Sequence, residues 1–164
     1  MDSENVNPKN LESRPPSIED LVKLCRELNS AGVHYIVIGG LAVIAQGLTR
    51  ATEDIDLLIQ DNLENHTKLL TVLNQLPDGA SKELKPEDLS QFEVIRVADE
   101  FVIDLMTKAC GETYTGNEKL LDPKIIDSVT IPFASVEFLL KLKQGLREKD
   151  VIDRTFLERK IGNK

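Results

Sequence analysis

Two short apolar segments constrain the fold more than any other feature of this sequence. Residues 34–38 and 54–59 are rich in β-branched and aliphatic side chains and are too short for buried helices, so they predict two buried strands. The first segment runs directly into Gly39-Gly40 and then into a short helical stretch over 41–46. A strand, a glycine turn, a short helix and a second strand predict a chain that combines helices with a small sheet.

The flanking segments extend this pattern. Ser17 followed by Asp20 resembles a capping box, and apolar residues at helical spacing lead from there to a C-terminal cap at Gly32. Residues 77–90 show no clear pattern and are read as polar loop or short helix. We expect an α+β or α/β fold, with a small mixed β-sheet flanked by helices and further helices at the C-terminus. The other predicted elements are a helix over 61–76 with Asp61 as its cap, strands over 92–97 and 101–106, a short strand within 125–133, and helices from 135 and over 149–160.

Length and composition favour one domain. The 164 residues are enough for one hydrophobic core. Residues 1–16 are polar, contain three prolines and lack periodicity, so we expect a disordered leader at 1–16 and a single domain over 17–164. The acidic N-terminus does not resemble a secretory signal, and no apolar run approaches the roughly 20 residues that span a bilayer. With two cysteines and no C-x-x-C pair, we expect a cytoplasmic protein without membrane contact.

The net charge limits the choice of partners. The chain carries a formal charge of −8 at pH 7. Proteins that grip long nucleic acids usually present a basic surface, because neutralising phosphates supplies much of their affinity, so the charge disfavours extended DNA or RNA binding. A local basic pocket stays compatible with it. An acidic chain with carboxylate metal ligands can bind a nucleotide as its magnesium complex.

Three aspartates stand in strand context. Asp54 and Asp56 flank an apolar residue, so in a strand both point to the same face, where like charges repel unless a cation lies between them. Asp104 is the single charged residue of the apolar run 101–106, and a buried carboxylate needs a metal ion or a basic partner. The alternatives are a solvated strand end for the pair, and a salt-bridged core residue or a strand-end residue for Asp104.

Gly39 and Gly40 lie between a strand and a helix. Glycines at such a turn let backbone N–H groups approach a ligand closely, which suits a phosphate group. Tight packing of the turn is the alternative explanation of the pair.

The combination resembles the signature of the polymerase-β-like nucleotidyltransferases. It consists of Gly39-Gly40, thirteen intervening residues, Asp54-Ile55-Asp56 and the later Asp104. The stretch from Arg50 to Leu57 is similar to the Arg-x-Thr-x-Asp-apolar-Asp form of small stand-alone members, including those of toxin–antitoxin and abortive-infection systems and some antibiotic-modifying enzymes. Residues 139–153 resemble the C-terminal segment of the abortive-infection type. The resemblance covers about residues 17–160.

The resemblance implies a metal-dependent active site. Asp54 and Asp56 would hold two Mg²⁺ ions, and Asp104 would complete the metal site nearest the nucleophile and help to accept its proton. Such an enzyme transfers a nucleoside monophosphate from a nucleoside triphosphate to a hydroxyl group and releases pyrophosphate. Gly40 stands where many members carry serine, which leaves only backbone donors at that position.

The resemblance also implies a phosphate-binding set. The backbone of Gly39 and Gly40 would cradle the triphosphate, and Arg50 and Lys143 would neutralise its charge. Arg50 could instead pair with Glu53 or another nearby acid. Lys143, Arg147 and Asp150 could equally tie the last two helices together, and Asp150 and Asp153 are read as structural.

Two functions from different classes fit these features. The first is an enzyme, whose acceptor could be a protein side chain, a tRNA 3′ end or a small molecule such as an antibiotic. The acidic charge favours a cationic antibiotic or a protein partner over tRNA. The second is a non-catalytic binding module on the same fold, such as one partner of a toxin–antitoxin pair. The three costly carboxylates favour the enzyme, and magnesium-dependent nucleotide binding separates the two.

Overall fold

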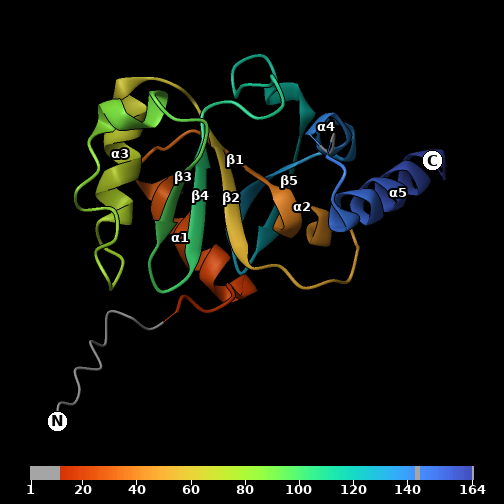
Figure 1. Ribbon diagram of the computed structural model, residues 1–164, viewed down its shortest axis with the longest axis horizontal. Helices are drawn as coiled ribbons and strands as arrows, with labels where there is room; N and C mark the ends of the chain where they lie inside the picture. Colours follow the sequence, from red (N-terminus) through yellow and green to blue (C-terminus); the bar gives the residue numbers. More distant parts are fainter. Residues whose placement is uncertain (1–11, 143–144, 164) are drawn as a thin grey trace, which may run out of the picture.

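A computed structural model describes residues 12–142 and 145–163 of the chain, in which six strands form one mixed sheet. Figure 1 shows the strands in the middle of the molecule, with α3 on one side and α4 and α5 on the other. In chain order the elements are α1 (Ile18–Ser30), β1 (Tyr35–Ile38), α2 (Gly39–Ala45), β2 (Asp54–Ile59), α3 (Leu63–Leu73), the 3-10 helix η2 (Pro86–Ser90), β3 (Ile95–Ala98), β4 (Val102–Met106), the 3-10 helix η3 (Glu118–Leu120), β5 (Leu121–Ile126), β6 (Val129–Ala134), α4 (Val136–Leu142) and α5 (Glu148–Gly162).

The sheet order is β3-β4-β2-β1-β6-β5. β2 pairs in parallel with β4 and antiparallel with β1, and β1 pairs in parallel with β6. The two ends of the sheet are antiparallel hairpins, β3 with β4 and β5 with β6. β1 and β2, which flank the glycine turn, therefore lie in the interior of the sheet. The predicted mixed sheet with flanking and C-terminal helices is confirmed.

The core lies against the central strands. All four residues of β1 are buried, and Ile55, Leu57 and Ile59 alternate along β2 with no exposed surface. α1 contacts α3 and β6, whereas α2 packs against β1, β2 and α4. Burying an aliphatic side chain of this size contributes roughly 1.5–3 kcal/mol each. The side of α1 that faces the core carries Leu21, Val22, Leu24, Cys25 and Leu28.

The predicted start of α1 is confirmed in detail. The backbone N–H of Asp20 donates to Ser17 Oγ (3.2 Å), and the backbone N–H of Ser17 donates to Asp20 Oδ2 (2.7 Å), which makes the expected capping box. Gly32 follows the C-cap residue and has φ +75°, a left-handed conformation that favours glycine.

The segment before α1 contacts the rest of the molecule. Residues 1–11 of the expected leader lie outside the described residues. Ser13 Oγ donates to the carbonyl of Asp99 (2.7 Å), and the backbone N–H of Arg14 donates to the carbonyl of Glu100 (3.0 Å). Contacts with the rest of the molecule are therefore present at Ser13 and Arg14, while the boundary of the domain stays a prediction.

Three elements differ from the expectation. The strand expected over 92–97 begins later, as β3 over Ile95–Ala98, and Phe92 is exposed. The N-cap of α3 is Asn62 rather than Asp61, and its side chain accepts from the N–H of Asn65 (2.8 Å). The expected strand within 125–133 is a hairpin, in which β5 precedes β6 and Pro132 lies inside β6 opposite Pro123. The turn of this hairpin uses Asp127 and Ser128 at positive φ, and it contains no glycine.

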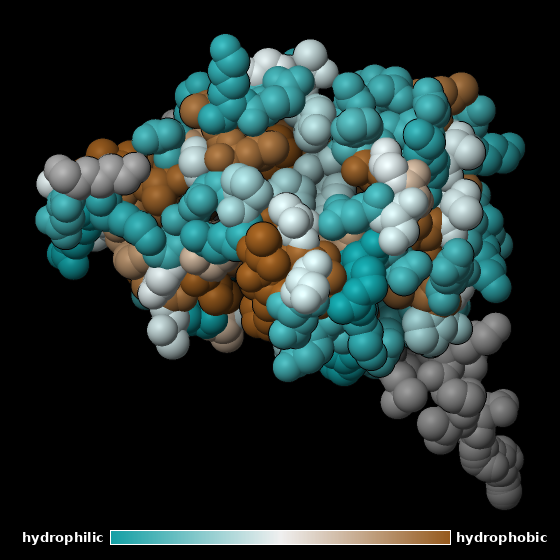
Figure 2. Space-filling model, turned by 180° about the vertical axis from the view of Figure 1, so that it is seen from behind, coloured by the Kyte–Doolittle hydropathy of each residue, from teal (hydrophilic) through white to brown (hydrophobic). Residues whose placement is uncertain are grey.

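The surface is mixed in character. Figure 2 shows hydrophilic side chains over most of one face, with smaller hydrophobic patches between them. Within residues 12–142 and 145–163, the helices are too short or too polar to cross a bilayer.

Candidate active site

Four neighbouring residues form a row across one face of the sheet. Arg96 of β3 is the register partner of Asp104 of β4. Asp104 is the partner of Asp56 of β2, which in turn is the partner of Ile38 at the end of β1. Asp54 lies two residues before Asp56 and shares its face. The sheet register therefore brings the three predicted aspartates together, next to the glycine turn that follows Ile38.

The three carboxylates converge closely. One oxygen atom from each of Asp54, Asp56 and Asp104 lies within 4.8 Å of the other two, and this is the single such acidic group among the described residues. The side chain of Asp104 is 8% exposed and that of Asp54 is 24% exposed. Burial, together with the neighbouring Asp104, raises the pKa of Asp54 above its ordinary value, while Arg96 and Lys149 partly oppose this. Oxygen donors at this spacing fit a hard divalent cation such as Mg²⁺.

Arg96 is a site residue that sequence reasoning missed. Its Nε donates to Asp104 Oδ1 (2.9 Å), and its Nη2 donates to Asp104 Oδ2 (3.0 Å) and to Asp54 Oδ2 (3.4 Å). The hydrogen bonds to Asp104 raise the pKa of Arg96. The sequence required a metal or a basic partner for Asp104. The identity of that partner depended on the register of the β3–β4 hairpin.

Both glycines of the turn are packed against site side chains. Gly39 has φ +70°, and a Cβ atom at this position would overlap the carboxylate of Asp56. A Cβ atom at Gly40 would lie 2.6 Å from Thr52 Oγ1 and 2.9 Å from Arg50 Nη2. Close packing thus explains why glycine stands at both positions. It is compatible with a phosphate seat, because the same backbone lines the cleft described below.

Arg50 joins the cleft to α5. Its Nε and Nη2 donate to the two oxygens of Asp153, each at 2.8 Å, and Asp153 is fully buried. Its Nη1 donates to the carbonyl of Ala51 (2.7 Å). The acid that pairs with Arg50 is therefore Asp153 of α5 rather than Glu53. Contact between Arg50 and phosphate stays a prediction, and Lys143 lies outside the described residues.

These residues open onto a cleft of about 750 Å³. The chain is acidic overall, yet five lysine or arginine residues line the cleft against four aspartate or glutamate residues. The sequence did not predict Lys108 and Lys149 as site residues. It offered Arg147 as a residue that links the last two helices, and in the structure Arg147 Nε donates to Asp150 Oδ2 (2.8 Å). The lining residues are Ile38, Gly39, Gly40, Arg50, Thr52, Asp54, Asp56, Glu93, Val94, Arg96, Asp104, Met106, Lys108, Ala109, Cys110, Gly111, Leu142, Arg147 and Lys149.

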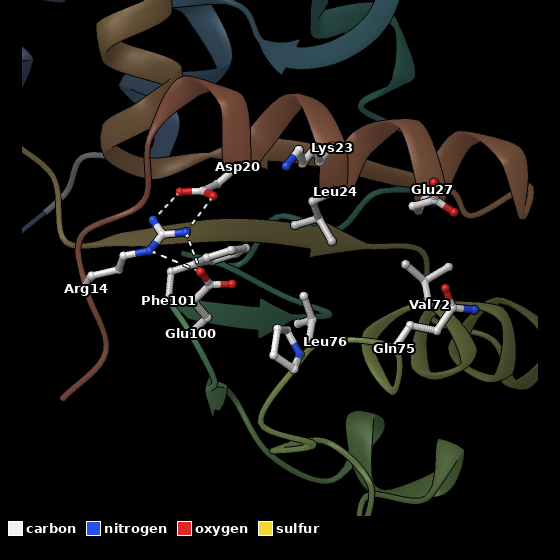
Figure 3. Close-up of a pocket in the computed structure, with 11 residues that line it drawn as sticks. Arg14, Asp20, Lys23, Leu24, Glu27, Val72, Gln75, Leu76, Glu100 and Phe101 are labelled. Atoms are coloured by element: carbon white, nitrogen blue, oxygen red, sulfur yellow. Dashed lines mark hydrogen bonds and ion pairs between the residues drawn. The ribbon is translucent and has the colours of Figure 1, made fainter. Parts of the chain in front are cut away.

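A second cavity, of about 300 Å³, shares no lining residue with this cleft. It lies between α1, the end of α3 and the β3–β4 turn, with Leu24, Leu76 and Phe101 among its apolar side chains. Figure 3 shows Arg14 bridging Asp20 and Glu100 at one end of it. This ion-paired, largely apolar cavity lacks the converging carboxylates of the cleft, so the chemistry is assigned to the cleft.

The similarity to known proteins is seen in structure rather than in sequence. No family model and no curated protein matches the chain. A Thermotoga maritima protein described as a nucleotidyltransferase is 17% identical with a TM-score of 0.52, covering 89% of this chain and 92% of its own. A lincosamide antibiotic adenylyltransferase with lincomycin bound is 17% identical with a TM-score of 0.55, covering 90% and 98%. This chain has the polymerase-β-like nucleotidyltransferase fold.

A third nucleotidyltransferase-fold structure supports the same assignment. The antigenic nucleotidyltransferase-like protein from Paracoccidioides brasiliensis is 20% identical with a TM-score of 0.55, covering 90% of this chain and 78% of its own. At sequence identities of 17–20%, the similarity of this chain to the three proteins is a similarity of fold. Within this nucleotidyltransferase fold, the three aspartates lie together on one face of the sheet, beside the glycine turn.

Proposed function

We propose that this protein is a divalent-metal-dependent nucleotidyltransferase. It transfers a nucleoside monophosphate from a nucleoside triphosphate to an acceptor hydroxyl and releases pyrophosphate. The observation that carries the proposal is the convergence of Asp54, Asp56 and Asp104 on one face of a nucleotidyltransferase fold, next to Gly39 and Gly40.

The acid cluster is the proposed metal site. Asp54 and Asp56 would hold two Mg²⁺ ions, with Asp104 as the third ligand residue. The fit rests on the donor set, three carboxylates of which two are largely shielded from solvent, and on the fact that a cationic group, the Arg96 guanidinium, already binds there. Divalent ions at such a site neutralise phosphate charge and lower the pKa of the attacking hydroxyl.

The chain's own residues orient the two substrates. The backbone of Gly39 and Gly40 binds the triphosphate at the β1 end of the row, where Arg50 lines the same wall. Lys143 is proposed to add a further positive charge from the chain that follows α4. Asp104, at the β4 side of the row, holds the acceptor hydroxyl and accepts its proton.

The acceptor is proposed to be a small molecule. The volume of the cleft, about 750 Å³, falls within the range of small-molecule sites. One protein with a similar fold is an adenylyltransferase of a lincosamide antibiotic, which supports an antibiotic-like acceptor over a protein side chain or a tRNA 3′ end. The net charge of −8 also disfavours tRNA.

Calorimetric titration tests the proposal. Each of the four nucleoside triphosphates is titrated into the protein with and without Mg²⁺. We expect Mg²⁺-dependent binding of at least one nucleotide, and its loss in an Asp54→Asn/Asp56→Asn double variant that unfolds cooperatively. A Glu64→Gln/Asp127→Asn variant removes two exposed acids outside the cleft and keeps binding. Wild-type protein that binds no triphosphate would overturn the enzyme assignment in favour of a binding module.

A further inference from the structure

Arg96 contacts two carboxylates of the acid cluster, more than a single structural ion pair would need. Its guanidinium reaches across β4 and contacts both Asp104 oxygens and one Asp54 oxygen, at 2.9–3.4 Å. These two carboxylates supply two of the three converging ligand groups. The positive charge therefore lies at the place where the proposed divalent cation would be coordinated.

The side chain of Arg96 borders on solvent. It is 62% exposed, whereas that of Asp104 is 8% exposed. Among the described residues, β3 is the outer strand of the sheet and pairs with β4 alone. Water and salt screen the exposed guanidinium, which limits what its ion pairs add to stability. Asp104, in contrast, needs a cationic partner at all times, because an uncompensated buried carboxylate is costly.

We propose that Arg96 is a built-in competitor of the divalent cation. It neutralises Asp104 and Asp54 in the metal-free protein, and it withdraws from both when the cation binds. Like charges this close repel, so the guanidinium and the metal ion exclude each other from the same carboxylates. Arg96 thereby sets the metal affinity of the site and keeps the cluster preformed between turnovers. The inference rests on the proposed metal site.

Binding of Mn²⁺ in the absence of nucleotide, measured by electron paramagnetic resonance, tests the proposal. Arg96→Gln is expected to tighten Mn²⁺ binding by about tenfold or more, because one adjacent cation changes the proton affinity of a carboxylate by at least that factor. Arg96→Lys keeps the charge without the forked donor and gives a smaller gain. Arg14→Gln is the matched control, since Arg14 also bridges two acids but lies outside the cleft, and it leaves the affinity unchanged.

The outcomes separate this inference from the metal site itself. If wild-type protein binds Mn²⁺ and Arg96→Gln leaves the affinity unchanged or lowers it, Arg96 positions Asp104 for the metal and the competitor role is wrong. If neither protein binds Mn²⁺, both the inference and the metal site fail.

A second measurement uses the wild-type protein, so that the test does not depend on whether the variants fold. The side-chain Nε–H signal of Arg96 is followed by nuclear magnetic resonance during titration with diamagnetic Mg²⁺. We expect this signal to shift and to exchange faster with water as Mg²⁺ saturates the site. A signal that stays unchanged at saturation would refute the withdrawal of Arg96.

Discussion

Gly39 and the carboxylate of Asp56 are packed so closely that no side chain fits at Gly39 unless the carboxylate moves. The left-handed φ of Gly39 turns the chain from β1 into α2 and clears the space that the carboxylate fills. Gly40 lacks the left-handed φ, and its missing side chain leaves room for Thr52 Oγ1 and Arg50 Nη2. The two glycines thus hold the loop before β2, and through it two of the metal-binding candidates, against the start of α2.

Gly39→Ala is therefore expected to damage both stability and the site. Strain at a positive φ costs about 1–3 kcal/mol, and the new methyl group displaces the Asp56 carboxylate. Urea unfolding measures the first effect, and Mn²⁺ affinity measures the second. Gly162→Ala, where the new Cβ meets nothing outside its own helix within 4 Å, is the control and lowers neither stability nor affinity. Wild-type Mn²⁺ affinity in Gly39→Ala would show that the turn does not position Asp56.

At the scale of elements, α5 is bound to the cleft by a buried ion pair. Asp153 lies in α5 with no exposed surface, and both of its oxygens accept from Arg50, whose side chain is 18% exposed. Arg50 stands in the loop before β2, 103 residues away in the chain. This pair fixes the last helix relative to the strand that carries Asp54 and Asp56.

Asp153→Asn tests the contribution of this ion pair to stability. Removing one partner of a buried pair leaves the guanidinium of Arg50 without its counter-charge, so we expect a loss of about 3 kcal/mol in the free energy of unfolding. Urea unfolding measures it. Glu64→Gln breaks the exposed pair with Lys68 on α3 and is expected to cause no resolvable change. Equal stability of the two variants would contradict a structural role for Asp153.

The start of α1 gives a pH-dependent prediction. Hydrogen bonds from Arg14 hold the pKa of Asp20 well below its usual value of 3.8. Because the folded-state pKa is lowered, Asp20 stabilises the fold fully above about pH 4, and this contribution is lost as the pH falls below it. Wild type and Asp20→Asn should differ in stability at pH 7 and converge at lower pH. A difference that persists unchanged at pH 2.5 would contradict this assignment.

The elements that were predicted well are those with a strong local signal. β1, β2 and α1 are set by apolar runs and by the capping residues Ser17 and Asp20, all visible in the sequence. β5 was not predicted as a separate strand, because its proline and its lysine interrupt the apolar pattern and the following turn lacks glycine. The convergence of Asp54, Asp56 and Asp104 follows from strand spacing once the strands are known. The partners of Arg96 and Arg50 depend on hairpin register and helix docking, which no short segment encodes.

At the scale of the whole molecule, the charge is divided unevenly. The chain carries −8 overall, yet the cleft gathers Lys108, Arg147 and Lys149 together with Arg50 and Arg96. The cations of the cleft offset its acids and so admit a triphosphate, while the acidic remainder repels long nucleic acids. This distribution fits a compact nucleotide complexed with a metal better than an extended polyanion.

The most direct test of the central claim is a crystal structure with Mn²⁺ and a non-hydrolysable nucleoside triphosphate. Anomalous scattering from manganese locates the ions without reference to any assumed site. The account predicts manganese bound by Asp54, Asp56 and Asp104, with phosphate oxygens between the metal and the backbone of Gly39 and Gly40. Manganese bound elsewhere, or a triphosphate that does not contact the glycine turn, would contradict it.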